Sequence, residues 1–480
     1  MCREKRKLPI GIENFEQIIK DDFYYVDKTG LISGLLRNWG MVNLFTRPRR
    51  FGKSLNMSML EHFFSVEGDK SIFDGLKISK DKKLCEEYIG KHPVISISLK
   101  GINAASYEAA FELTVKTIKG AVQKAGFLKM SDKLDEDEKK EYRAILDENM
   151  SEATLFWSLK NLSELLEKHY ETKVILLIDE YDVPLAKAFE NGYYDKMVFL
   201  IRNLLEQTLK TNNSLKFAVM TGCMRISKES IFTGLNNLKV LSITDERFDE
   251  YFGFTDEDVK EMLRYYDRED HYEEMRNWYD GYRFGSTDVY CPWDVLNHCD
   301  KIKENAAAFP ENYWVHTSSN EAVKKIIQMS GNITTKREIE RLLAGEEIVK
   351  EIRQELTYQE MYQSVENIWS LLFMTGYLTQ RQRLDASHYK LAIPNLEVRV
   401  IFKTQIMEYF KEGVAKDGDT LKQLCDALKG GDAEKDNQYS RYICEEIIKR
   451  EFLPWNFARH FRCQRRLGSI FKQGNRGRVQ

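Results

Sequence analysis

The chain has 480 residues, enough for about three domains of ordinary size and at least one large buried core. Hydrophobic residues make up 42% of it and charged residues 31%, which excludes a mainly disordered chain. The 72 basic and 75 acidic side chains leave a net charge of −3, so the protein as a whole has no positive field that would hold nucleic acid.

Signals for the cell compartment favour the cytoplasm. The most apolar run, residues 174–178, is far shorter than the roughly 20 residues of a membrane-crossing helix. The basic start is followed by Pro9 and Gly11 instead of an apolar segment, so we expect no secretory signal. The eight cysteines stand singly, without metal-ligand spacing, which is typical of free thiols in a reducing compartment. We therefore expect a cytoplasmic protein without membrane contact.

The first half of the chain alternates strand-like and helix-like segments, which predicts an α/β domain with a mostly parallel sheet. We expect strands at 41–46, 93–99, 174–178, 215–221 and 239–244, and helices at 54–64, 107–126, 151–170 and 197–209. Shorter helices follow, at 255–264, 273–279 and 321–328. A helix at 360–374 and a hairpin of 377–383 with 388–393 suggest a winged-helix-like module or, equally on pattern alone, an unrelated small α+β cap.

The segment after the first predicted strand has the pattern of a phosphate-binding loop. Residues 47–54 read R-P-R-R-F-G-K-S and match G-x-x-x-x-G-K-[ST] except at Arg47, where the motif has glycine. In this pattern Lys53 binds the β- and γ-phosphates and Ser54 holds Mg²⁺. Taken alone, the segment is better explained as a basic turn that Gly52 closes before an ordinary helix.

Two adjacent carboxylates directly follow the buried strand predicted at 174–178. We expect Asp179 to hold Mg²⁺ through water, and Glu180 to orient and deprotonate the water that attacks the γ-phosphate. Acidic pairs are common after strands, but here the loop and the acids both stand at the carboxyl ends of strands, in the right order, and together they predict nucleotide binding. At the end of the next strand, Thr221 and Arg225 are either sensors of the γ-phosphate or an ordinary strand-ending threonine and a solvated arginine.

Several segments together resemble the prokaryotic AAA-ATPase-like family over about residues 8 to 400. They are Y-V-D-K-T (25–29), R-P-R-R-F-G-K-S-L (47–55), L-I-D-E-Y-D-V-P-L (177–185), N-N-L (236–238), F-G-F-T (252–255), Y-D-G-Y (279–282) and G-Y-L-T (376–379). R-P-R-R-F-G-K-S-L is that family's own phosphate loop, so Arg47 departs only from the general motif. The resemblance implies an ASCE-type P-loop NTPase related to the STAND-like signalling NTPases, with a parallel sheet flanked by helices, usually followed by a C-terminal PD-(D/E)XK nuclease-like domain.

The motifs and the resemblance together define the candidate site. We expect the nucleotide to be bound by Arg49, Arg50, Phe51, Gly52, Lys53, Ser54, Leu55 and Asp179, Mg²⁺ by Ser54 and Asp179, and catalysis to depend on Glu180, Lys53, Thr221 and Arg225. Arg49 and Arg50 either clamp phosphate or contact a neighbouring subunit. Asp27 and Lys28 either help to close the pocket or are a helix-capping acid and an exposed lysine, and Asp280 has the position of a turn residue.

Four regions are expected along the chain. They are a P-loop AAA-ATPase-like domain (1–245), a helical lid with the winged-helix-like region (246–395), a remnant of the start of a nuclease-like domain (396–450) and a basic tail (451–480). After residue 400 we find no Asp followed by a (D/E)-x-K strand, the metal-binding pattern of such a nuclease.

The tail is explained best by a frameshift. It holds seven Lys or Arg against one acidic residue. Permitted codons for residues 451–479, read one nucleotide later, give F-Y-H-G-I-L-L-G and then S-N-R-E-T-G-E-G, which resembles the opening of the family's nuclease domain. We therefore predict a frameshift near Arg450 and a truncated chain whose last residues are disordered. The alternative is a basic arm that binds nucleic acid.

These observations predict an intracellular, Mg²⁺-dependent P-loop ATPase in which hydrolysis of ATP switches the position of the helical and winged-helix-like region. The alternative is a nucleotide-gated binding module that scarcely hydrolyses ATP and recognises a partner or DNA. Nuclease activity is not expected in the truncated chain. ATP and Mg²⁺ are the expected ligands, and self-association and DNA binding through the winged-helix-like region stay open.

Overall fold

A computed structural model describes residues 5–147, 149–226, 232, 237–314, 320–329 and 333–416. The chain forms two compact units. The first is Met1–Ser318 with Val349–Glu397, and the second is Ser319–Ile348 with Val398–Gln480. The phosphate-loop and acidic segments both belong to the first unit. The basic tail and most of the nuclease remnant lie outside the described residues, so the frameshift and the four-region division stay predictions.

The first unit is built on a five-stranded parallel sheet in the order β2-β3-β4-β1-β6. Its strands are β1 (Val42–Thr46), β2 (Val94–Ser98), β3 (Val174–Asp179), β4 (Leu215–Gly222) and β6 (Leu238–Leu241). β4 lies between β1 and β3, with Thr46 paired with Gly222 and Ile178 with Met220. The carboxyl ends of these three strands are therefore level, and the phosphate loop and the acidic pair leave the sheet at the same edge.

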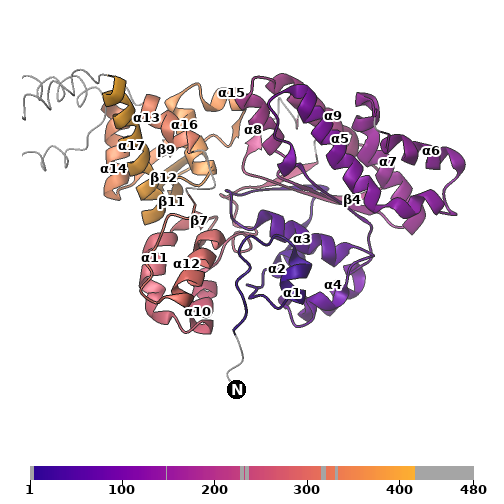
Figure 1. The fold of residues 1–480 in the computed structure, drawn as a ribbon, viewed down its shortest axis with the longest axis horizontal. Coiled ribbons are helices and arrows are strands. Elements are labelled where there is room, and N and C mark those ends of the chain that lie inside the picture. The colour runs from indigo at the N-terminus through magenta and orange to yellow at the C-terminus, as the bar shows by residue number, and fades with distance from the viewer. Residues whose placement is uncertain are drawn as a thin grey trace, which may run out of the picture. The chain divides into compact units, whose positions relative to one another are not determined.

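Helices cover both faces of the sheet, which is why β1 and β3 are buried along their whole length. Figure 1 shows one group below the sheet and another above it. The first group is α1 (Phe15–Lys20), α2 (Gly30–Asn38), α3 (Lys53–Phe64) and α4 (Lys82–Tyr88); the second is α5 (Tyr107–Lys124), α7 (Glu152–Tyr170), α8 (Val183–Glu190) and α9 (Tyr194–Leu209), with α6 (Glu136–Ile145) packed on α7. The predicted α/β sheet flanked by helices is confirmed.

The last strand of the sheet is shorter and earlier than the predicted 239–244. It ends at Leu241 because residues 242–245 form a turn. The Asp245 carboxylate accepts a hydrogen bond of 2.8 Å from the Ser242 amide, and the Asp245 amide donates to the Ser242 carbonyl. An aspartate that bonds backbone in this way competes with a strand ladder.

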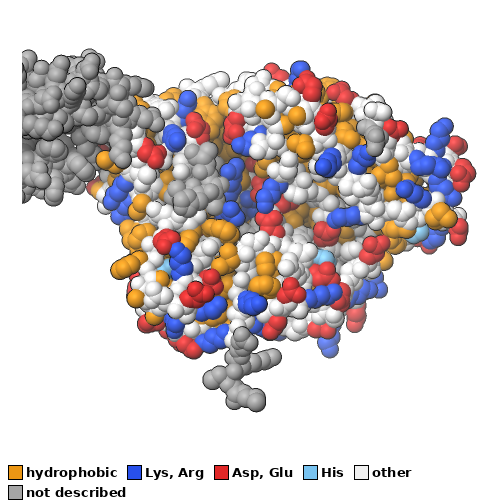
Figure 2. All heavy atoms as spheres, in the orientation of Figure 1, with side chains coloured by type: hydrophobic (Ala, Val, Ile, Leu, Met, Phe, Trp, Pro, Cys, Tyr) orange, Lys and Arg blue, Asp and Glu red, His pale blue; other side chains and the backbone are white. Residues whose placement is uncertain are grey.

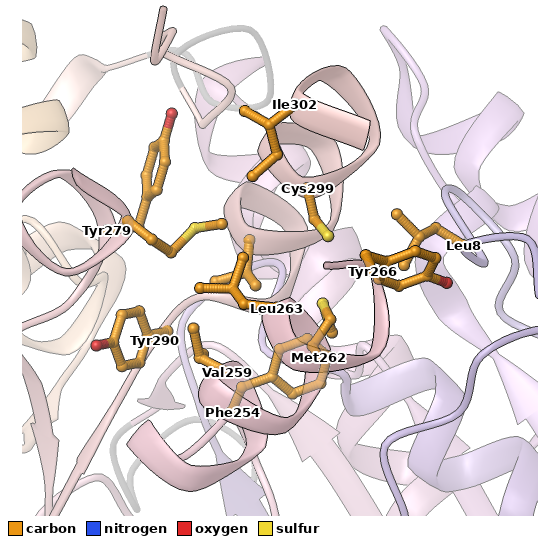
Figure 3. Packing of buried hydrophobic residues seen from close by; sticks show 12 residues of the cluster. Leu8, Phe254, Val259, Met262, Leu263, Tyr266, Tyr279, Tyr290, Cys299 and Ile302 are labelled. Atoms are coloured by element: carbon orange, nitrogen blue, oxygen red, sulfur yellow. The ribbon is translucent and has the colours of Figure 1, made fainter. Parts of the chain in front are cut away.

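Downstream of the sheet, α10 (Asp256–Tyr265), α11 (Tyr272–Tyr279) and α12 (Pro292–Glu304) enclose a second apolar core, with the hairpin of β7 (Tyr282–Phe284) and β8 (Thr287–Val289) beside it. Figure 3 shows this core, in which Leu8 of the N-terminal segment packs near Tyr266. The sequence prediction missed α12, which begins with Pro292. Proline has no backbone N–H, but the first residue of a helix does not need one, because that group has no partner within the helix. Short 3₁₀ turns occupy Lys70–Phe73, Lys77–Lys80, Leu99–Gly101, Gly126–Met130 and Glu269–His271, the last of which is η6.

The predicted hairpin is confirmed as β11 (Thr379–Arg383) paired antiparallel with β12 (His388–Ala392), to which β9 (Ile348–Glu351) adds a third strand. The helix predicted at 360–374 is instead two, α15 (Tyr358–Met361) and α16 (Val365–Met374). They separate because the Ser364 hydroxyl caps α16 by accepting from the Asn367 amide. β5 (Arg225–Ile226) pairs with β10 (Glu355–Leu356). A winged-helix arrangement is not confirmed.

The second unit contains α13 (Glu321–Met329), α14 (Ile333–Ala344) and most of α17 (Leu396–Lys416). Within the described residues, no helix combines the length and apolar character needed to cross a bilayer. Figure 2 shows basic and acidic side chains interspersed over the visible face of the described residues, in keeping with the nearly balanced charge of the sequence.

Candidate nucleotide site

The loop between β1 and α3 turns sharply into the start of the helix. Arg50 and Gly52 both have left-handed backbone angles, with φ of 70° and 76°. Glycine adopts this conformation freely, whereas an arginine needs compensating contacts. The Arg50 guanidinium lies 4.1 Å from the centre of the Trp293 ring. The backbone carbonyl of Arg50 accepts a hydrogen bond from the Cys291 thiol. The first residues of α12 therefore hold this loop in shape.

The amino end of α3 fits an anionic ligand. Gly52 supplies no side-chain cap, and the first turn of the helix contains no acidic residue. The backbone N–H groups of this turn and the positive end of the helix dipole are therefore available to an anion. Residues 49–56 also form part of the wall of a cavity of about 380 Å³. A phosphate chain is the group that such a helix end suits.

Lys53 begins α3 and is almost completely buried. Its ammonium group donates to the carbonyls of Arg47 and Pro48, at 3.2 and 3.1 Å, and pairs with the Glu180 carboxylate at 3.2 Å. Burial by itself lowers the pKa of Lys53, but the acidic groups around it, Cys223 and Glu180 foremost, outweigh burial and raise the pKa above its ordinary value. The lysine therefore carries its charge at the cavity throughout the physiological pH range.

Asp179, the last residue of β3, joins the phosphate-loop helix to the sheet. Its carboxylate accepts a hydrogen bond of 2.7 Å from the Ser54 hydroxyl and a second, short one from the Thr221 hydroxyl at the end of β4. Burial raises the pKa of Asp179, while these two hydrogen bonds act in the opposite direction. The structure thus brings together three predicted residues, and their oxygens are of the kind that Mg²⁺ prefers.

Glu180 follows Asp179 in a left-handed backbone conformation, with φ of 54°. Its amide donates to the Thr221 hydroxyl at 3.3 Å, and its side chain, 13% exposed, reaches Lys53. A non-glycine residue is held in this conformation only by its surroundings, and such residues are frequent at functional sites. The backbone turn aims the carboxylate into the same cavity as the start of α3.

Beside the loop, the cavity has apolar side chains in its wall. They come from the N-terminal segment, from the segment just before α10, and from helix α12. The residues of that wall include Pro9, Ile12, Tyr24, Val26, Phe254, Trp293 and Leu296. The lining also includes the charged residues Glu13, Lys28 and Lys100. A cavity lined by both charged and aromatic side chains suits a ligand with a charged and a flat apolar part. Gly253 lines the cavity with φ of 120°, where a Cβ atom would lie 2.9 Å from Val289.

The other predicted loop residues have different surroundings. Arg49 lines the cavity, and although burial lowers its pKa, the nearby Cys223 and Asp182 raise it overall. Leu55 lies in the cavity wall as well. Phe51 is fully buried, with its ring 5.0 Å from each of the rings of Tyr282 and Phe284, so it anchors the loop in the protein core.

Arg225, like Asp179 and Thr221, is not among the residues that line this cavity. Its guanidinium pairs with the Glu355 carboxylate at 2.6 Å, across the β5–β10 pairing. Of the two candidate phosphate sensors, the structure therefore brings only Thr221 to Asp179 and Glu180.

Asp182 is a buried acid to which the sequence assigned no role. Its carboxylate accepts from the amides of Cys223 and Met224 at 2.8 and 3.2 Å, and burial raises its pKa to about 6. It thereby fixes the turn after β4, opposite Lys53. Asp182 could have been assigned to the site from the sequence, because it lies two residues after Glu180 in the D-E-Y-D segment. Trp293, which the sequence analysis also did not assign to the site, is in no motif that would have indicated it.

The flanking motif residues have structural partners. Asp27 is not the N-cap of α2, a position that Thr29 takes. Its carboxylate accepts from the amide and hydroxyl of Thr29 and from the Lys77 amide, so it ties the turn before α2 to the 3₁₀ turn at Lys77–Lys80. Lys28 lines the cavity but pairs with Asp258 at 2.6 Å, and burial lowers its pKa. Asp280 accepts from the Gly281 amide within its turn.

Arg47, the departure from the general motif, has a structural task. Its guanidinium is fully buried and donates to the carbonyls of Thr46, Leu241 and Phe248 at 2.9, 2.8 and 3.4 Å. It also lies over the rings of Phe252 and Phe284. Burial lowers its pKa to about 10. Arg47 therefore ties the end of β1 to the end of β6 and to the segment that follows.

Comparison with known proteins agrees with this geometry. Residues 9–232 match the family described as predicted AAA-ATPase. The chain is also 29% identical, over 430 residues, to an uncharacterized protein from the vnfD 5′ region of Azotobacter chroococcum mcd 1. That match covers 85% of this chain and 71% of the relative. The comparisons support a generic ATPase and show neither a nuclease domain nor a relation to STAND proteins.

We predict that Arg47→Met destabilises the protein by about 3 kcal/mol, because the packing of the stem is kept while three buried carbonyls lose their donor. Urea denaturation measures the loss. The matched control is Arg247→Met, which removes an arginine whose side chain is 54% exposed and is expected to stay within about 0.5 kcal/mol of the wild type. Equal stability of Arg47→Met and the wild type would contradict the structural role.

Proposed function

We propose that this protein binds ATP with Mg²⁺ and hydrolyses it to ADP and phosphate as a nucleotide-driven switch. The observation that carries the proposal is the 2.7 Å hydrogen bond from Ser54 to Asp179, which places a hydroxyl and a carboxylate beside the buried Lys53 at the start of a helix. The match of residues 9–232 to a predicted AAA-ATPase family agrees with it.

In this proposal Lys53 and the N–H groups at the start of α3 bind the phosphates. Ser54 and Asp179 would hold Mg²⁺, which would neutralise negative charge on the bound phosphates. Arg49 lies in the same wall and adds a second fixed positive charge. Thr221 orients the Asp179 carboxylate and at the same time fixes the backbone of Glu180.

Glu180 is proposed to accept the proton of the attacking water. In the structure its carboxylate pairs with Lys53 at 3.2 Å. A phosphate that takes the lysine as its partner frees Glu180, so water activation becomes available only when the triphosphate is in place. The ion pair thus links ligand binding to the readiness of the base.

The switch is proposed to act through α12. Trp293 and Leu296 of this helix line the cavity, and Trp293 packs on the Arg50 guanidinium in the loop itself. A change in the loop on hydrolysis therefore reaches α12 directly, and with it the core that α10, α11 and α12 share.

Lys53→Ala is expected to weaken ATP binding about 10–100-fold, because it removes a charge-assisted contact to phosphate. Glu180→Gln is expected to bind ATP but to release phosphate at least about 100-fold more slowly. Calorimetric titration with ATP and a steady-state phosphate assay measure the two effects, with Lys124→Ala, an exposed lysine, as the control.

Unchanged ATP binding by Lys53→Ala would contradict the site, and equal hydrolysis by Glu180→Gln and the wild type would contradict the role of Glu180. ATP binding by the wild type without phosphate release above that of Lys53→Ala would favour the nucleotide-gated binding module instead.

Thr221→Val is expected to slow hydrolysis about tenfold or more, since it removes the hydroxyl that bonds both Asp179 and Glu180. Thr221→Ser keeps the hydroxyl and should restore most of the rate. Arg225→Ala is expected to have the smaller effect, because its guanidinium pairs with Glu355. A larger loss in Arg225→Ala than in Thr221→Val would reverse the assignment of the sensor.

A further inference from the structure

A second group of ligand-type side chains lies in the helical part of the first unit, outside the nucleotide cavity. His271 ends η6, Glu274 stands in the first turn of α11, and His298 is on α12. Their ligand atoms all lie within 4.8 Å of one another. We propose that these three residues bind a divalent first-row transition metal ion, with Zn²⁺ as its representative.

The distances suit such an ion. The Glu274 carboxylate oxygen Oε1 is 3.2 Å from Nδ1 of His271 and 3.2 Å from Nε2 of His298. Bonds of about 2.0–2.1 Å in a tetrahedral shell separate neighbouring ligand atoms by about 3.3 Å. The glutamate therefore stands from each imidazole at the spacing that zinc ligands have, and the two imidazole nitrogens lie within 4.8 Å of each other.

The kinds of donor point to a transition metal. Two imidazole nitrogens with one carboxylate oxygen suit zinc and its first-row neighbours, whereas Mg²⁺ and Ca²⁺ prefer oxygen throughout. The site therefore differs in chemistry from the Ser54–Asp179 pair. Three protein ligands leave a fourth position for water in a tetrahedral shell.

His298 is the buried member of the group. Its side chain is completely buried, and it lies on α12, which packs against α11. Its Nε2 atom faces the Glu274 carboxylate, whereas its Nδ1 atom is buried without a hydrogen-bond partner among the described residues.

The surroundings provide support and access. Asp270 lies 3.8 Å from Nε2 of His271, so it can orient that ring from outside and adds negative charge. The side chains of His271 and Glu274 are 12% and 35% exposed, which leaves the ion a path from solvent to the buried His298. Binding would fasten η6 and α11 to α12.

The test uses the full chain, stripped of metal with a chelator and kept free of nucleotide, so that it is independent of the proposed ATPase. Titration with Zn²⁺ in competition with a chromophoric chelator is expected to show a site that Glu274→Gln weakens at least about tenfold. At about a hundredfold excess over its dissociation constant, Zn²⁺ should raise the Tm of the wild type by about 3 °C and that of Glu274→Gln by about half as much or less.

The eight cysteines could also bind zinc, so Co²⁺ serves as a second probe. Imidazole and carboxylate ligands give visible bands without the near-ultraviolet charge-transfer band of a cobalt thiolate. The matched control is His388→Asn, which removes an exposed histidine paired with Asp385 at 3.0 Å. It should keep the Zn²⁺ affinity of the wild type.

Four results would overturn the proposal: no Zn²⁺ binding by the wild type, equal affinity in Glu274→Gln, loss of the Co²⁺ site in His388→Asn, or a Co²⁺ spectrum dominated by thiolate bands. Glu274→Gln keeps a hydrogen-bonding side chain and leaves the buried His298 in place, and circular dichroism checks that it folds. His271→Gln, at a partly exposed position, should repeat the loss.

Discussion

The bond network of Asp179 is the constraint on which the nucleotide site depends. One carboxylate accepts from a hydroxyl at the start of α3 and from a hydroxyl at the end of β4, so it joins three separate elements. The parallel register makes this possible, because β1, β4 and β3 end level with one another. Without the strand order that places β4 between β1 and β3, Ser54 and Thr221 could not share one acid.

The site also contains two buried cations that differ in their surroundings. Lys53 and Arg47 are both buried cations within seven positions of each other, yet their pKa values shift in opposite directions. Arg47 meets mainly carbonyls, and burial dominates its pKa, while Lys53 faces carboxylates that outweigh burial. Arg47 is therefore a fixed structural cation, whereas Lys53 stays charged and can exchange its partner for an incoming anion.

The sequence could predict what depends on local pattern. The five strands of the sheet, the loop at 47–54 and the acids at 179–180 follow from periodicity and from the rule that parallel strands end at one edge. The task of Arg47 could not be foreseen, because its carbonyl partners at Leu241 and Phe248 are about 200 residues away. The ion pair of Arg225 with Glu355 and the contact of His271 with His298 could not be predicted either, because in each case the partners are distant in the sequence and belong to different elements.

Two left-handed residues without glycine's freedom, Arg50 and Glu180, face the same cavity from different strand ends. The Arg50 guanidinium packs on Trp293 of α12, whereas the Glu180 side chain pairs with Lys53 and its amide donates to Thr221. Strained backbone persists only where surrounding contacts overdetermine it, and these contacts help to hold the two turns. Because Trp293 and His298 lie on the same helix, α12 contacts the phosphate loop through one residue and supplies a proposed metal ligand through the other.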